Sequence, residues 1–278
     1  MVLFPNCKIN LGLNIIRKRD DGYHDLETVF YPVAIRDALE GIKSGVGSLS
    51  RDGREGVQFR SSGLEIGGED GNNLCVKAYH LLQKDFPDLP SVQLHLHKNI
   101  PMGAGLGGGS ADGAFTLKLL AKLCQLNLSI EQLNNYALQL GSDCPFFISN
   151  KPCFASGRGE KMKEIVLDLS NYTFLIVNPG IHISTADAFL GIIPKKPKIS
   201  ILDIVCRPVN QWKESLLNDF EIPVSKQYPQ IAAIKQKLYA NGATYASMTG
   251  SGSTVFGLFT KETAINLTAF SPYLVYKV

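Results

Sequence analysis

Alternating apolar positions near the start of the chain predict a strand over residues 7–16. Its apolar face consists of Ile9, Leu11, Leu13 and Ile15. The opposite face is polar and carries Lys8, Asn10, Gly12 and Asn14. This pattern is typical of a half-buried strand whose polar side is solvated. The Asp-Gly pair at residues 21–22 then predicts a hairpin turn, with the returning strand over residues 26–33.

Further periodic segments follow along the chain. Residues 91–98 alternate as a strand, with His95 and His97 on its polar face. Helical periodicity marks residues 72–86, 110–126, 129–141, 184–190 and 228–240, and the segment 129–141 opens on the capping-box pair Ser129 and Gln132. Apolar strands are expected at 174–177 and, around a glycine turn, within 245–259. Strands and helices mix without regular βαβ alternation, which favours α+β layers over a doubly wound sheet.

Composition narrows the class of protein. The chain has 278 residues, of which 45% are apolar and 19% charged, as in an ordinary globular protein. A net charge of +3 is too small to indicate a nucleic-acid partner. The six cysteines are scattered without a C-x-x-C pair, and neither a secretory signal nor a long apolar span is present. We therefore expect reduced thiols and a cytoplasmic enzyme with no membrane partner.

The most informative segment is residues 100–115, IPMGAGLGGGSADGAF, where six glycines surround a Ser-Ala-Asp that opens a helical run. Such a loop lets a polyphosphate approach main-chain N–H groups at the positive end of a helix. Ser110 is placed to cap that helix or to face a phosphate or metal ion. A dinucleotide fingerprint would need an acidic residue about twenty positions further on, and a P-loop would need a lysine before Ser110; both are missing. A flexible linker would be polar and repetitive, unlike this segment.

Three other residue patterns carry candidate chemistry. Asp143 follows a helix end, where an aspartate is usually a turn former or cap, but beside a phosphate loop it could serve as a general base. Lys8 could be a solvated strand residue or a cation that offsets charge during phosphoryl transfer. His95 and His97 lack a third ligand nearby, so they indicate a polar face rather than a metal site. Lys98, at the end of its strand, is a candidate nucleotide contact.

Residues 101–111, PMGAGLGGGSA, resemble the phosphate-binding signature of the GHMP kinases, the superfamily of galactose, homoserine and mevalonate kinases. This resemblance implies that ATP is the phosphate donor and that Mg²⁺ accompanies it, with Ser110 as the only candidate ligand. It also implies a second glycine turn, at residues 250–253, packed against the loop. The residues that it assigns to ATP are Pro101, Met102, Gly103, Ala104, Gly105, Leu106, Gly107, Gly108, Gly109, Ser110 and Ala111.

Other motifs resemble one branch of this superfamily. Its Pro-Ala-Lys-Ile-Asn-Leu opening resembles residues 5–11, PNCKINL, where Asn6 follows the proline and Cys7 stands in place of alanine. Its Arg-x-Asp-Gly-Tyr-His hallmark matches residues 19–24. That branch phosphorylates the 2-hydroxyl of 4-diphosphocytidyl-2-C-methyl-D-erythritol in the non-mevalonate route to isoprenoids. The resemblance implies that Lys8 and Asp143 are catalytic. It assigns the substrate, a small molecule linked to cytidine diphosphate, to Asn10, Tyr23, His24, Asn73, Thr185 and Phe189.

The implied fold is a two-lobed α+β GHMP kinase fold. Residues 1–160 would form a lobe like ribosomal protein S5 domain 2, and residues 161–278 a ferredoxin-like lobe. Two alternative functions each predict that a particular motif is missing. Another GHMP kinase, such as homoserine kinase, would lack the Asp-Gly-Tyr-His run, and a non-catalytic nucleotide-binding regulator would lack Lys8 or Asp143. All of these residues are present.

Overall fold

A computed structural model describes residues 1–44, 56–67, 70–189 and 191–278. They form two compact units, neither of which is continuous in sequence. Unit 1 comprises Met1–Cys7, Ala34–Met102 and Gly107–Asn150, and unit 2 comprises Lys8–Val33, Gly103–Leu106 and Lys151–Val278. A division into lobes at residue 160 stays a prediction. Among the described residues, no helix combines the length and hydropathy needed to cross a bilayer.

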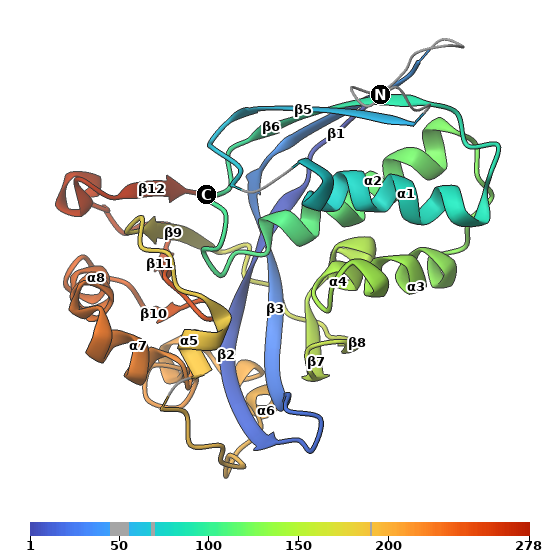
Figure 1. The fold of residues 1–278 in the computed structure, drawn as a ribbon. Coiled ribbons are helices and arrows are strands. Elements are labelled where there is room, and N and C mark those ends of the chain that lie inside the picture. The colour runs from blue at the N-terminus through green and yellow to red at the C-terminus, as the bar shows by residue number, and fades with distance from the viewer. Residues whose placement is uncertain (45–55, 68–69, 190) are drawn as a thin grey trace. The chain divides into compact units, whose positions relative to one another are not determined.

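Unit 1 is a sheet covered by helices (Figure 1). The strands lie in the order β1-β4-β6-β5, and all neighbours are antiparallel except β5 and β6. Their bounds are β1 Val2–Leu3, β4 Ala38–Lys43, β5 Val57–Gly63 and β6 Val92–Lys98. Burial alternates strictly along β6, as its sequence predicts, because one face of the strand meets the core and the other meets solvent.

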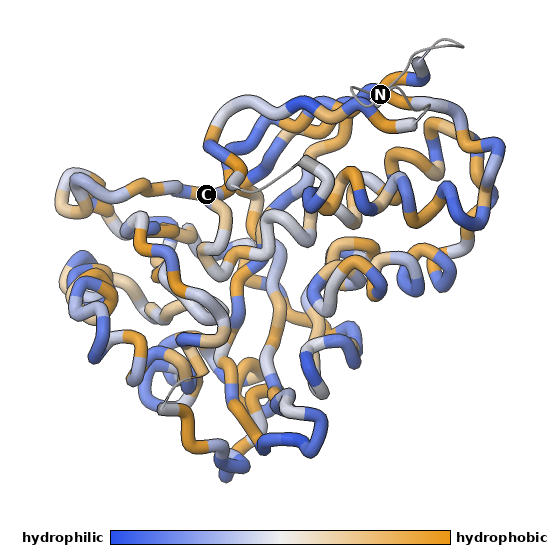
Figure 2. Tube along the Cα trace, viewed as in Figure 1, coloured by the Kyte–Doolittle hydropathy of each residue, from blue (hydrophilic) through white to orange (hydrophobic). Residues whose placement is uncertain are grey.

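The helices of unit 1 pack around α2, which contacts α1, α3, α4 and the strands β1 and β4. Their bounds are α1 Leu74–Asp85, α2 Gly108–Leu123, α3 Ile130–Leu140 and α4 Cys144–Ser149, and a short 3-10 helix, η1, covers Asp70–Asn72. Hydrophobic and hydrophilic positions alternate along α1 (Figure 2). Both hydrogen bonds of the expected capping box at Ser129 and Gln132 are present at the start of α3.

Unit 2 contains two antiparallel sheets. One has the order β2-β3-β7-β8, and the other has the order β10-β11-β9-β12. The bounds are β2 Asn6–Lys18, β3 His24–Arg36, β7 Cys153–Gly157, β8 Lys161–Glu164, β9 Tyr172–Asn178, β10 Tyr245–Met248, β11 Val255–Thr260 and β12 Leu274–Lys277. The first residues of β2 and the last of β3 belong to unit 1. The expected hairpin turn joins β2 to β3, with Gly22 at φ 83°.

The helices of unit 2 include α8 Pro229–Ala240, which packs on β10 and β11 and against α7 Glu221–Gln227 (Figure 1). The others are α5 Thr185–Phe189, α6 Ile201–Val205, η2 Val209–Gln211 and η3 Leu267–Phe270. Among these, α6 buries Ile201, Ile204 and Val205. The apolar core of this unit gathers around Leu175, Val177, Ile231, Val255 and Phe259.

One expectation about β2 is wrong. Both faces of this strand are buried from Asn6 to Ile15, and the polar residues Lys8 and Asn10 are only 4% and 2% exposed. Buried polar side chains need hydrogen-bond partners. Other segments of the fold must therefore provide partners for Lys8 and Asn10. The six cysteines all lie within the described residues, and none of them forms a disulfide.

Candidate active site

The glycine loop has the backbone that its sequence predicts. Gly103, Gly105 and Gly107 have φ of 62°, 76° and 70°, in the left-handed region that favours glycine. α2 begins at Gly108, and Gly107 is its N-cap without a side-chain cap bond. The expectation that Ser110 caps this helix is therefore wrong, because Ser110 lies inside the first turn. The N-terminal N–H groups of α2 remain available to an anion.

The second glycine turn packs against the loop within unit 2, as the resemblance implied. The Thr249 hydroxyl donates a hydrogen bond to the Gly105 carbonyl oxygen over 3.1 Å. A Cβ on Gly105 would lie 2.1 Å from the carbonyl oxygen of Thr249, so only glycine fits there. The Lys8 backbone N–H also donates to the Leu106 carbonyl oxygen over 2.9 Å. These contacts fix the middle of the loop against the turn and the strand β2.

Lys8 belongs to a buried polar network in unit 2. Its Nζ donates to Asn10 Oδ1 over 2.6 Å, and Asn10 Nδ2 donates to the Thr28 hydroxyl over 3.0 Å. The same amine lies 4.8 Å from the centre of the Phe30 ring. The alternative of a solvated lysine is therefore wrong. This network restricts the Lys8 side chain, which suits a cation that must be held at one position.

Asp143 lies at the N-cap of α4, but its side chain makes no cap hydrogen bond. Capping therefore does not explain this residue. Burial raises the pKa of the thiol of the next residue, Cys144, to about 12. Within unit 1, α4 packs against α2, the helix that follows the glycine loop.

Lys98 has a fully buried side chain. Its Nζ donates to Asp37 Oδ2 over 2.5 Å and to Asp112 Oδ2 over 2.6 Å. Burial opposes the charge on this amine, but the two carboxylates outweigh that effect and raise its pKa. Burial also raises the pKa of Asp112, although the Lys98 ammonium limits the rise. A direct contact between Lys98 and a nucleotide stays a prediction.

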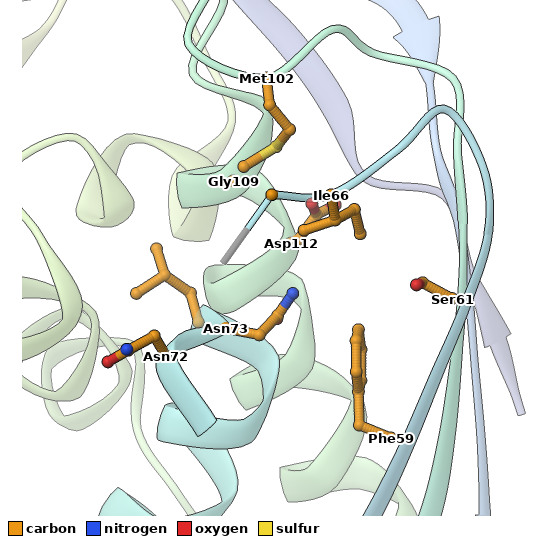
Figure 3. A pocket seen from close by; sticks show the side chains of 10 residues that line it. Phe59, Ser61, Ile66, Asn72, Asn73, Met102, Gly109 and Asp112 are labelled. Atoms are coloured by element: carbon orange, nitrogen blue, oxygen red, sulfur yellow. The ribbon is translucent and has the colours of Figure 1, made fainter. Parts of the chain in front are cut away.

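A pocket of about 140 Å³ opens in unit 1 beside α2 (Figure 3). Asn73, expected to bind substrate, lines it together with Met102 and Gly109 of the glycine loop, both expected to bind ATP. Asn73 is also the N-cap of α1 and accepts a hydrogen bond from the Cys75 N–H over 2.8 Å. The remaining lining is Phe59, Ser61, Ile66, Gly67, Asn72, Leu74 and Asp112. Its size suits a single ring system rather than a whole nucleotide, because pockets for drug-sized ligands are larger.

The aromatic residues expected to bind a base lie in unit 2. His24 stacks directly on Phe189, with ring centroids 4.4 Å apart and planes at 16°. Two rings at this separation leave no space for a third between them. Tyr23 is 56% exposed, and the Arg158 guanidinium lies 4.8 Å from the centre of its ring. Core packing explains part of the position of Phe189, which contacts the apolar core of unit 2, but it does not explain Tyr23.

The remaining expectations concern metals and Thr185. The described residues contain no group of three His, Cys, Asp or Glu side chains that could hold a metal ion. His95 and His97 instead share the Ser62 hydroxyl, which lies 3.0 Å from His95 Nε2 and 3.0 Å from His97 Nδ1. This agrees with a polar strand face. Thr185 is exposed at the first position of α5.

Several residues of this site were not singled out from the sequence. They include Thr28 and Thr249 around Asn10, Asp37 and Asp112 around Lys98, and Phe59 and Asn72 in the pocket. The short motif Ser-Ala-Asp placed Asp112 next to the loop, but nothing local indicates its partner. A signal that could have found Asp37 is its position at the end of a buried strand, where a carboxylate rarely lacks a cation.

Comparison with known proteins agrees with these features. The family model described as GHMP kinases N terminal domain matches residues 73–151, and the one described as GHMP kinases C terminal matches residues 207–270. A solved mevalonate kinase from Methanococcus jannaschii, 13% identical, superposes with a TM-score of 0.71 and covers 100% of this chain and 97% of its own. That likeness shows the fold alone. The chain belongs to the GHMP kinase family.

Within that family, the most similar relatives share one name. The 4-diphosphocytidyl-2-C-methyl-D-erythritol kinase of Bacteroides thetaiotaomicron is 53% identical over 262 residues, which cover 94% of this chain and 93% of that protein. The protein of the same name from Bacteroides fragilis is 52% identical over 265 residues, with 95% and 94% covered. A crystal structure of 4-(cytidine 5'-diphospho)-2C-methyl-D-erythritol kinase, 29% identical, has a TM-score of 0.79 and covers 93% of this chain and 90% of its own.

Proposed function

We propose that this protein transfers the γ-phosphate of ATP to the 2-hydroxyl of 4-diphosphocytidyl-2-C-methyl-D-erythritol. The observation that carries the proposal is the packing of α4, whose N-cap is Asp143, against α2, the helix that begins at the glycine loop. This packing supports a role for the Asp143 carboxylate near a loop that is shaped for phosphates. The names of the relatives supply the acceptor, and the Asp-Gly-Tyr-His run at residues 21–24 supports the same choice.

In this mechanism each residue has a defined task. Asp143 accepts the proton of the 2-hydroxyl while that oxygen attacks the γ-phosphorus, and the bond to the bridging oxygen breaks to release ADP. Lys8 supplies a positive charge that favours the ionised acceptor, and Asn10 holds the Lys8 amine over 2.6 Å. The main-chain N–H groups of the loop and of the first turn of α2 bind the transferring phosphate.

Magnesium is part of the proposal, and one residue at the loop, Ser110, could serve as a protein ligand for it. Mg²⁺ on a nucleotide usually takes its oxygens from phosphates and water, with one or two from the protein. The Ser110 hydroxyl is an oxygen donor at the loop, so a protein cluster of three ligands is not required. When bound, the ion would neutralise charge on the phosphates.

The pocket beside α2 is proposed to hold the adenine ring of ATP. Phe59, Ile66 and Met102 supply apolar surface, while Asn72 and Asn73 supply polar groups. On the acceptor side, the cytosine is proposed to stack on the exposed ring of Tyr23, with His24 and Phe189 beside it. This placement follows from the direct stacking of His24 on Phe189, which excludes a base between those two rings.

The decisive experiment is an assay that couples ADP release to a measurable oxidation, run with the cytidyl substrate, homoserine, mevalonate and galactose in parallel. We expect turnover with the cytidyl substrate alone. Turnover with homoserine or mevalonate instead would move the protein to another branch of the family. ATP binding without turnover on any of the four would favour a non-catalytic regulator.

A further inference from the structure

The ends of the glycine loop are joined by one buried ion cluster in unit 1, made of Asp37, Lys98 and Asp112. The Lys98 and Asp37 side chains expose no surface, and that of Asp112 exposes 4%. Lys98 is the last residue of β6 and lies three residues before Pro101, where the loop begins. Asp112 lies in α2, five residues after Gly107. A single ammonium group therefore binds the segment that enters the loop and the helix that leaves it.

Asp37 extends this cluster to the main chain at the loop entrance. Its Oδ1 accepts hydrogen bonds from the N–H groups of Asn99 and Ile100, over 2.6 and 2.8 Å. Its own N–H donates to the Pro5 carbonyl oxygen over 2.8 Å. Asp37 therefore holds the two residues immediately before Pro101, and its other carboxylate oxygen holds Lys98.

At the loop exit, the start of α2 rests directly on Lys98. A Cβ on Gly108 would lie 3.0 Å from Lys98 Nζ and 2.8 Å from Ile100 Cγ2. The first residue of the helix therefore packs against the ammonium and against the residue that enters the loop. Such contacts leave little freedom in the distance between Ile100 and Gly108.

We propose that Asp37, Lys98 and Asp112 are positioning residues for ATP, and that their ion cluster holds the glycine loop open at the span that a triphosphate needs. This inference rests on the proposed function of the loop. Three buried ionisable side chains are costly to maintain for stability alone, since well-packed apolar residues often serve as well. A preorganised phosphate site is a physical gain that such apolar residues would not supply.

The proposal separates ATP from adenosine, because the main-chain N–H groups of the loop would bind only phosphates, whereas adenosine would use the side chains that line the pocket beside α2. In Asp37→Asn, the single amide oxygen can still accept from the N–H groups of Asn99 and Ile100, and the NH₂ group then faces Lys98, where it cannot accept a hydrogen bond. We expect calorimetry to show ATP binding weakened at least about tenfold. Adenosine binding, which depends on the pocket beside α2, should change by less than about twofold.

Two further variants keep the test decisive. Lys98→Met alone leaves two buried carboxylates and risks misfolding, so it is combined with Asp37→Asn, after which Asp112 can take up a proton. Lys118→Met is the matched control, since Lys118 is a partly buried lysine of α2, the helix that also holds Asp112, and its amine donates to the carbonyl oxygens of Phe147 and Ile148. The double variant should lose ATP affinity as Asp37→Asn does, and the control should keep it.

Two outcomes would overturn the proposal. One is unchanged ATP affinity in folded Asp37→Asn and in the double variant, and the other is an equal loss for ATP and adenosine. Gly107→Val distinguishes this failure from failure of the proposed function. If folded Gly107→Val loses ATP while Asp37→Asn keeps it, the loop binds phosphates without help from the cluster. If Gly107→Val also keeps ATP, the nucleotide does not use this loop at all.

Discussion

Asn150 donates a hydrogen bond from its Nδ2 to Oδ1 of Asn6 over 2.8 Å, between residues 144 positions apart in the chain. Asn150 ends α4, the helix that begins next to Asp143, and Asn6 opens β2, two residues before Lys8. Asn150 also has a left-handed backbone, with φ of 54°. One side chain thus combines a tertiary hydrogen bond with a conformation that asparagine tolerates better than most residues.

This pair gives a prediction about stability. Asn150→Gly removes the hydrogen bond but keeps the left-handed backbone at no steric cost, so the free energy of unfolding should fall by about 1 kcal/mol. Asn150→Ala loses the same bond and adds about 1 kcal/mol of backbone strain. Urea denaturation of the two variants measures the difference. Equal stability of the alanine and glycine variants would contradict the role of the backbone.

Asp143 is predicted to be the catalytic base. Asp143→Asn keeps the size of the side chain but removes its capacity to accept a proton, so turnover should fall by roughly 10²–10⁴-fold. ATP affinity, measured by calorimetry, should stay close to that of the parent. Turnover within about threefold of the parent would remove Asp143 from this role.

Lys8 and Asp143 are predicted to act on the same step, so their effects should not add. Lys8→Met should lower turnover strongly, and the double variant Lys8→Met/Asp143→Asn should be no slower than the slower single variant, within about threefold. Asn10→Ala serves as a comparison, because it keeps the Lys8 charge but removes the acceptor that holds the Lys8 amine, together with the Asn10 hydrogen bonds to Thr28 and Thr249. If the two losses multiply in the double variant, the residues contribute independently.

Tyr23 is predicted to carry the cytosine. Tyr23→Ala should weaken binding of the cytidyl substrate by about 1–3 kcal/mol, the scale of base–aromatic stacking. Phe189→Ala should also weaken it, since it removes the ring on which His24 stacks. ATP affinity should barely change in either variant. Equilibrium binding of cytidine diphosphate gives the measurement, and the pocket lies elsewhere if both variants bind as the parent does.

The stability of the protein should depend on pH through His24. Burial and the positive charge of Lys18 lower the pKa of His24 below its ordinary value of 6.5. The folded state therefore binds this proton less readily than the unfolded state. The resulting stability is fully present above pH 6.5 and decreases as the pH falls below it toward the lower folded-state pKa. The pH dependence of urea midpoints should be shallower in His24→Gln, and identical slopes in the two proteins would contradict the assignment.

Gly107 tests the main-chain binding of phosphates. Gly107→Val places a β-branched residue at φ 70°, which costs on the order of 1–3 kcal/mol in strain and closes the approach to the loop. ATP binding should fall sharply, while the cytidyl substrate should still bind. Gly242→Val is the matched control, because Gly242 has φ 92° at the end of α8, outside the loop. Melting curves of both variants show whether each is folded.

The sequence by itself determined the features that depend on neighbouring residues. The glycine loop, the hairpin at residues 21–22 and the capping box at Ser129 follow from local backbone preferences and short hydrogen bonds. The alternation along β6 follows from the two faces of a single strand. These features need no knowledge of the rest of the fold, because the physical cause lies within a few residues.

Only the tertiary structure decided what lies against those elements. The polar face of β2 can be buried because the Asn10 side-chain oxygen accepts a hydrogen bond from the hydroxyl of Thr249, 239 residues away. Lys98 ends its strand as predicted, but its partner Asp37 comes from 61 residues earlier. Whether a polar side chain meets water, a ligand or a buried carboxylate depends on which distant segment packs beside it. The local pattern of polar and apolar residues cannot predict that environment, because burial depends on how the whole chain packs.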